Sequence, residues 1–248
     1  MDNNQNNFYG QSEPIKFTKN IFDAIRDPLF LVICILTSVI VALSFDIIYL
    51  LLMIGMWMIF ASTKNGSSPL PGAKLCAGTL KALYIINWIA IPIMFVGGAI
   101  MFIFSPFVLG VLKSEFGQRL IGRFVDLDDL YEELYQLTDL GIAIESLEII
   151  MIIGIGVSLM ISAIATLLFN IFFHKKLFIF AESLRNSISM PDAPILYANT
   201  IKTWTMVFAI INGVTLLGAI LTNTFLLSAA TTANFIILHI WIKNNFAY

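Results

Sequence analysis

The sequence predicts an all-α fold: a polytopic helical membrane protein with about six transmembrane helices and a central acidic, helical, extracellular insert. Two observations lead to this class. Only 12% of the residues are charged and 58% are hydrophobic, whereas a soluble domain carries about 25% charged residues. The apolar residues are also gathered into runs that are long enough to cross a bilayer. One acidic segment then divides these runs into two groups of three predicted spans.

Four regions follow from this pattern. Residues 1–16 are rich in Asn and Gln and cannot bury a core, so a disordered cytoplasmic tail is expected. Residues 17–112 are predicted to hold an amphipathic helix, a helical hairpin and the third span. Residues 113–146 form the extracellular insert. Residues 147–248 hold the fourth span, a cytoplasmic amphipathic segment and a C-terminal hairpin.

The first predicted helix covers residues 17–26 and is amphipathic. Phe17, Ile21, Phe22 and Ile25 recur at helical spacing and share one face. Two interpretations stay open, a helix that lies in the membrane surface and a solvated extension of the first span.

The apolar run that follows predicts a hairpin, 28–44 and 46–62. As one helix the run would be about 50 Å long, against a hydrocarbon core of about 30 Å. Asp27 followed by Pro28 is typical of a helix start, and Asp46 is placed to cap the second helix. An interfacial cap is the favoured role of Asp46, and a buried proton or ion site is the alternative. Each span is short, so full membrane crossing by this hairpin stays open.

Residues 63–81 are predicted to be a loop, because they are rich in Gly, Ser and Pro and carry three lysines. A second polar stretch covers residues 174–202 and begins with an amphipathic segment. The remaining spans are predicted at 82–112, 147–173, 203–221 and 224–242.

The distribution of basic residues predicts the orientation. In the six-span arrangement, 11 Lys and Arg residues fall on one side and 3 on the other. Basic residues concentrate on the cytoplasmic side of membrane proteins. We therefore expect a plasma-membrane protein with both termini in the cytoplasm and the acidic insert outside.

The fourth span carries small residues at strict intervals of four, which predicts a helix-packing edge because small residues let helices approach closely in lipid. Ile152 is expected on a different face. A pore-lining face is the alternative. The candidate edge comprises Gly154, Ser158, Ser162 and Thr166.

Polar side chains inside the predicted spans are a second set of candidates. They are expected to form interhelical hydrogen bonds, or to line a hydrated path if they converge. The set comprises Asp46, Asn87, Asn170, Asn212 and Asn234.

The insert supplies a candidate acidic face. Its residues 113–145 hold eight acidic and three basic side chains, a net charge of −5. The start of the face resembles a calcium loop, but the glycine and closing glutamate of such a loop are missing, so a helix cap is favoured. A solvated helix face is the expected role, and attraction of cations is the alternative. The face comprises Asp126, Asp128, Asp129, Glu132 and Glu133.

The sequence holds no HExxH, GxSxG or phosphate-loop motif and no intramembrane pair of acids, so a non-enzymatic protein without cofactor or metal is expected. The favoured function is helix packing and partner contact, and the alternative is the membrane subunit of a small transporter or permease. The expected partners are the lipid bilayer and a protein partner or homo-oligomer. Nucleic acid is not expected.

The layout resembles a family of uncharacterised multi-pass membrane proteins of anaerobic Gram-positive bacteria. The resemblance rests on a hairpin ending in MWMIFASTKNG, a loop leading into GTLKALYIINWI, and a helical insert containing DLYEELYQLTDLG. It covers most of the chain and implies a membrane location. It implies no activity.

Overall fold

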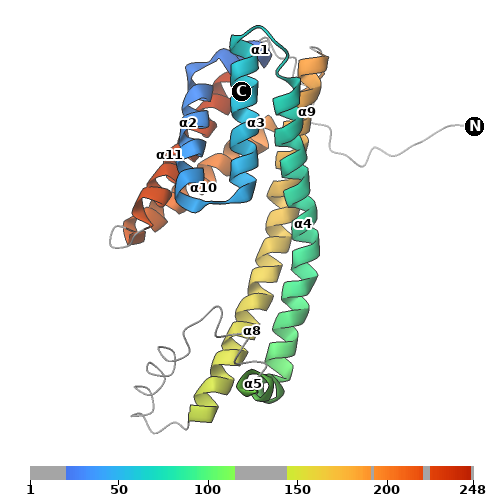
Figure 1. Ribbon diagram of the computed structural model, residues 1–248, viewed down its shortest axis with the longest axis vertical. Helices are drawn as coiled ribbons and strands as arrows, with labels where there is room; N and C mark the ends of the chain where they lie inside the picture. Colours follow the sequence, from blue (N-terminus) through green and yellow to red (C-terminus); the bar gives the residue numbers. More distant parts are fainter. Residues whose placement is uncertain (1–20, 115–143, 191–192, 220–223, 247–248) are drawn as a thin grey trace, which may run out of the picture. The chain divides into compact units, whose positions relative to one another are not determined.

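The computed structural model describes residues 21–114, 144–190, 193–219 and 224–246, and every element in these ranges is a helix (Figure 1). The predicted all-α class is therefore confirmed. The described residues form two compact units. Unit 1 holds the chain up to Tyr84 and from Ile171 onward, and unit 2 is Ile85–Asn170.

Unit 1 begins with a short helix and a hairpin. The short helix is α1 (Ile21–Arg26), and the hairpin consists of α2 (Pro28–Ser44) and α3 (Ile47–Lys64). These two helices coincide with the predicted ones, 28–44 and 46–62, to within two residues. α2 and α3 pack against each other, and α2 also packs against the last helix of the chain (Figure 1).

Two aspartates set the starts of the hairpin helices. The Asp27 carboxylate accepts the backbone N–H of Leu29 at 2.9 Å, at the start of α2. α2 ends at Ser44, and the next residue, Phe45, has a left-handed φ of 53° that reverses the chain. Asp46 then accepts the backbone N–H of Ile48 at 2.7 Å and caps α3. The favoured cap role of Asp46 matches this geometry.

The next helix, α4 (Leu70–Ile103), differs from the expectation of a loop at 63–81 and a span at 82–112. It begins 12 residues before the predicted span, because Pro71 lies in the first turn, where a missing N–H breaks no helical hydrogen bond. It ends at Ile103, because Pro106 has no N–H to donate to the carbonyl of Phe102 and so cannot continue the hydrogen-bond ladder. A separate helix, α5 (Ser105–Lys113), follows.

The chain returns through a long, nearly unbroken helix. It consists of α8 (Ile144–Phe169), a π-helix η1 (Asn170–His174) and α9 (Lys175–Ser189). The predicted fourth span, 147–173, covers most of α8 and η1. The expected amphipathic continuation is α9. The π-helix was not predicted, because one extra residue in a turn leaves no mark on an apolar pattern.

The final hairpin consists of α10 (Ala198–Ala219) and α11 (Phe225–Phe246), predicted as 203–221 and 224–242. The two helices pack along their length. Both extend beyond the apolar run at their polar ends, since helix formation does not stop where hydrophobicity does.

A cluster of four aromatic rings in unit 1 packs around Phe208, with Phe173 buried and the other three half-buried. The ring of Phe173 lies 4.8 Å from that of Phe208, edge to face, and the ring of Trp204 stacks on Phe208 at 5.6 Å. Phe235 of α11 completes the group, with its ring 5.3 Å from that of Phe208. Edge-to-face and offset pairs at these distances add to the free energy of area burial.

The two ends of the described chain in unit 1 are joined. The Trp241 indole N–H donates to the carbonyl of Ala24 at 2.9 Å, and the Trp241 ring packs on Phe30. The Asn245 amide donates to the Asp27 carboxylate, also at 2.9 Å. The start of α2 and the end of α11 therefore lie side by side. We call this group the terminal clasp.

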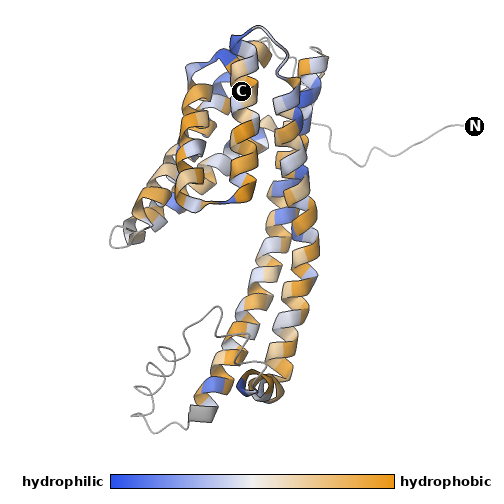
Figure 2. Ribbon diagram, in the orientation of Figure 1, coloured by the Kyte–Doolittle hydropathy of each residue, from blue (hydrophilic) through white to orange (hydrophobic). Residues whose placement is uncertain are grey.

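The helices identify the chain as membrane-embedded. Among the described residues, four stretches are long and apolar enough to cross a bilayer: α3, α4, α11 and Ser146–Ser189 of the long helix. α2 is apolar but shorter. Figure 2 shows hydrophobic residues along most of their length. At 1.5 Å per residue, the 34 residues of α4 extend about 51 Å, more than the hydrocarbon core of about 30 Å. The predicted number of six spans stays a prediction.

Candidate functional site

Unit 2 is built on a close contact between two antiparallel helices. A Cβ added at Gly98 of α4 would lie 2.6 Å from the carbonyl oxygen of Gly156 in α8. A Cβ added at Gly156 would lie 2.7 Å from the carbonyl oxygen of Gly98. Each glycine thus occupies space that a side chain on the other would need. Such reciprocal contacts let helices associate in lipid, where no hydrophobic force drives them together.

The structure places this contact on a different face of α8 from the candidate edge. A Cβ added at Gly154 meets no heavy atom within 4 Å, and Ser158 and Ser162 are exposed. Thr166 is half-buried, whereas Ile152, expected on a different face, is buried. Within the described chain, the Gly98–Gly156 contact therefore lies off the candidate edge, and a packing role for that edge stays a prediction. The regular spacing of four small residues favoured the candidate edge in the sequence, whereas the observed contact is made by a single glycine of α8, Gly156.

Two of the candidate asparagines meet in unit 2. The Asn87 amide donates to the Asn170 side-chain oxygen at 3.5 Å, between α4 and the end of α8. Asn170 has no exposed surface. An amide pair between apolar helices satisfies groups that lipid cannot, and it sets the register of the two helices. This is the interhelical hydrogen bond expected from the sequence.

The backbone around this pair departs from regular α-helix on both helices. Asn170 is the first residue of the π-helix, and π-turns occur frequently at functional sites. Pro92 lies inside α4, five residues after Asn87, and has no N–H to donate to the carbonyl of Trp88. The pair, the π-helix and the proline together form the polar site of the chain that is best supported by its geometry.

The other polar candidates lie elsewhere. The Asn212 amide donates to the carbonyl of Phe208 in its own helix at 2.9 Å. The side-chain oxygen of Asn234 is buried, and among the described residues it has no hydrogen-bond partner. Asp46 is exposed at the hairpin tip as a helix cap. Of the five polar candidates, only Asn87 and Asn170 are hydrogen-bonded to each other.

An ion pair that was not predicted from the sequence joins α5 to α8 in unit 2. Lys113, at the end of α5, lies 2.6 Å from the Glu148 carboxylate near the start of α8. The side chain of Glu148 is only 8% exposed. The available signal was a lone acid inside an apolar run, which is rare unless the acid is paired.

A second glycine contact, also not predicted, lies in unit 1. A Cβ added at Gly72 of α4 would lie 2.5 Å from the carbonyl oxygen of Gly55 and 2.8 Å from the backbone nitrogen of Ile59, both in α3. The Cys76 thiol, one turn further along α4, donates to the carbonyl of Leu52 at 3.7 Å. Two glycines far apart in sequence carry no pattern that would reveal their contact.

The candidate acidic face from Asp126 to Glu133 lies outside the described residues. Within the described ranges, no three His, Cys, Asp or Glu side chains come together in a way that could hold a metal ion.

Comparison of the chain with protein-family models, with curated proteins and with solved structures finds no match. The resemblance to membrane proteins of anaerobic Gram-positive bacteria therefore stays a prediction, and function has to be argued from the helices themselves.

Proposed function

We propose that this integral membrane protein resides in the plasma membrane and acts through helix packing and contact with a protein partner. The observation that carries the proposal is the surface of α4. Of its most apolar window of 18 residues, only 6% is buried inside the chain. Lipid alone can cover such a surface, but the glycine contacts of α4 show that this helix is already built to pack against other helices.

We further propose that both termini of the chain lie in the cytoplasm. The terminal clasp holds the start of α2 next to the end of α11, which agrees with an even number of crossings. Arg26, Lys64 and Lys243 flank the same ends of the hairpin helices, and basic residues favour the cytoplasmic side.

Cross-linking in native membranes followed by purification tests the proposal. A protein that co-purifies in a fixed ratio and cross-links through the exposed side of α4 supports it. A cross-linker at Ile93, which is 66% exposed, would report the contact, and one at the buried Ala73 is the matched control. Recovery of the chain with lipid alone from every cross-linking position contradicts the partner.

One observation favours a second candidate, the membrane subunit of a transporter. The Asn87–Asn170 pair lies at a π-helix and near a proline inside a helix, and irregular helices of this kind contribute to binding sites in transporters. The purification distinguishes the two candidates. A nucleotide-binding subunit among the cross-linked proteins favours transport. A cross-linked partner that does not bind nucleotide favours helix packing and partner contact.

A further inference from the structure

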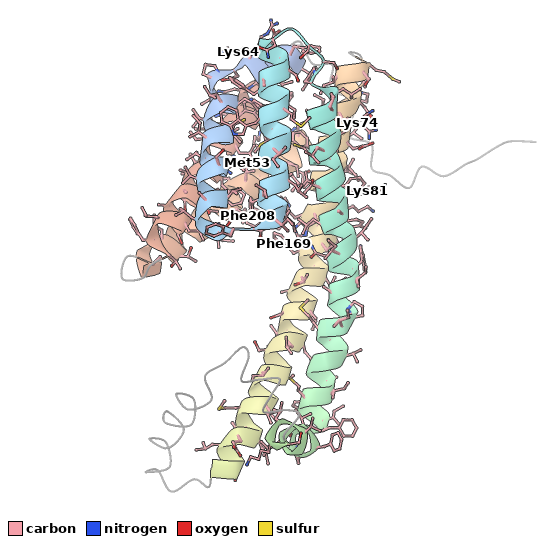
Figure 3. All side chains as sticks on the ribbon, in the orientation of Figure 1. Met53, Lys64, Lys74, Lys81, Phe169 and Phe208 are labelled. Atoms are coloured by element: carbon pink, nitrogen blue, oxygen red, sulfur yellow. The ribbon has the colours of Figure 1, made fainter. Side chains whose placement is uncertain are left out.

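One face of α4 carries positive charge at one end and apolar side chains along the rest. Lys74, Gly78 and Lys81 follow at steps of four and three residues and therefore share this face. All three are exposed, and a Cβ added at Gly78 would meet no heavy atom within 4 Å. Figure 3 labels Lys74 and Lys81 on the side of α4 that is turned away from α3.

Within the described part of the chain, no acid balances the charges of the two lysines. No acidic side chain of the described residues forms an ion pair with Lys74 or Lys81. The first turn of α4 contains no acid, so no carboxylate of that turn offsets the field of the lysines. An anion is thus favoured here by the positive charges of the two ammonium groups.

The same face then becomes apolar. Ile85, Trp88 and Val96 continue it at helical spacing and are 47%, 42% and 54% exposed. An exposed apolar stripe that begins where the two lysines end matches an amphiphile, with an anionic head and a hydrocarbon tail. A free anion would use only the lysines, and an acidic peptide would leave the apolar stripe uncovered.

We propose that this face of α4, with Lys74, Gly78 and Lys81 at its head and Ile85, Trp88 and Val96 along its tail, binds an anionic phospholipid. The two ammonium groups extend on flexible stems toward one phosphate, and the missing side chain of Gly78 leaves room for it. The acyl chains lie along the apolar stripe. Basic clusters beside membrane helices bind lipid phosphates in this way. The inference needs only a membrane-embedded α4 and does not depend on the proposed partner or on the orientation.

Photocross-linking of the full chain in vesicles tests the inference. A photoreactive phenylalanine derivative replaces Ile85, and the vesicles contain phosphatidylcholine with a minor fraction of phosphatidylglycerol. We expect the cross-linked lipid, identified by mass spectrometry, to be enriched in phosphatidylglycerol over the bulk. The double variant Lys74→Gln/Lys81→Gln should lower this enrichment about tenfold, because each basic residue near an anionic surface contributes to binding. Lys74→Arg/Lys81→Arg should retain it.

The matched control is Lys64→Gln/Lys243→Gln, which removes two exposed charges that do not belong to this face. It should keep the enrichment. Equal enrichment in the Lys74→Gln/Lys81→Gln variant overturns the inference, and so does an equal loss in the control, which would reveal a general effect of surface charge. Loss of the phosphatidylglycerol adduct on addition of inorganic phosphate would assign the lysines to a free anion and would also overturn it.

Discussion

Gly98 of α4 and Gly156 of α8 contact each other backbone to backbone, and each leaves no space for a side chain on the other. Along α8, the contact lies between the Asn87–Asn170 hydrogen bond, also made with α4, and the Glu148–Lys113 ion pair, made with α5, so three different interactions hold unit 2 together. The two glycines let the helix backbones approach closely enough for dispersion attraction between them. The polar pairs set the register of the helices relative to each other.

Replacing either glycine of this contact should separate the helices. Gly98→Leu and Gly156→Leu should each destabilise the folded chain by about 1–3 kcal/mol, because the new side chain meets backbone atoms that cannot yield. Gly97→Leu and Gly154→Leu are matched controls in the same two helices, since a Cβ at either meets no heavy atom within 4 Å. Thermal unfolding in detergent measures the difference. Equal effects at Gly97 and Gly98 would contradict the contact.

At the α3–α4 contact, the two glycines should respond differently to substitution by alanine, because one faces backbone atoms and the other faces a side chain. Gly72→Ala places its Cβ 2.5 Å from a carbonyl oxygen, so the helices must shift and the melting temperature should fall. The nearest atom to a Cβ at Gly55 is instead the Cys76 sulfur, also at 2.5 Å. The loss from Gly55→Ala should therefore be smaller when Cys76→Ala is present. A double-mutant cycle measures this coupling, and strict additivity would argue against it. Gly78→Ala, in open space, is the control.

The terminal clasp should contribute to stability through Asn245. Its amide donates both to the Asp27 carboxylate and to the carbonyl of Trp241. Asn245→Ala should lower the free energy of unfolding by about 1–3 kcal/mol, because the partly buried Asp27 carboxylate loses this charge-assisted hydrogen bond. The neighbouring Asn244 is exposed, so Asn244→Ala should change the unfolding midpoint little. Similar midpoints for both variants would show that the clasp adds nothing.

Substitutions of Asp46 distinguish its role as a helix cap from a role as an ion site. Asp46→Ala removes the acceptor of the Ile48 N–H and should cost about 0.5–2 kcal/mol. Asp46→Asn keeps a side-chain oxygen and should remain close to the parent chain in thermal unfolding. A loss of stability with Asn as large as with Ala would show that the negative charge, rather than the cap, is what matters at this position.

Helix starts could be predicted from the sequence because capping is local. Asp27 with Pro28, and Asp46 after the left-handed Phe45, specify their helices through atoms only two residues away. The extra turns of α4 before Ala82 were missed for the opposite reason. Glycine and proline suggested a loop, but the packing of Gly72 against α3 favours helix there, and such tertiary contacts are invisible in a local pattern.

The polar site could be predicted only in part. Asn87 and Asn170 stand out as amides in apolar runs, but nothing in the sequence distinguishes them from Asn212, which bonds to its own helix. Which asparagines meet depends on helix register. The π-helix that begins at Asn170 rotates the residues after it, and no apolar period records that rotation.

The most direct test of membrane topology is labelling of single cysteines with a membrane-impermeant maleimide in intact cells. Ser67→Cys lies in the exposed turn between α3 and α4, and Gln118→Cys lies in the acidic insert. The unaltered chain, with Cys34 buried and Cys76 half-buried, provides the background. We expect labelling at residue 118 in intact cells, and at residue 67 only after the membrane is permeabilised. Labelling of both positions in intact cells, or of residue 67 alone, would contradict the proposed topology.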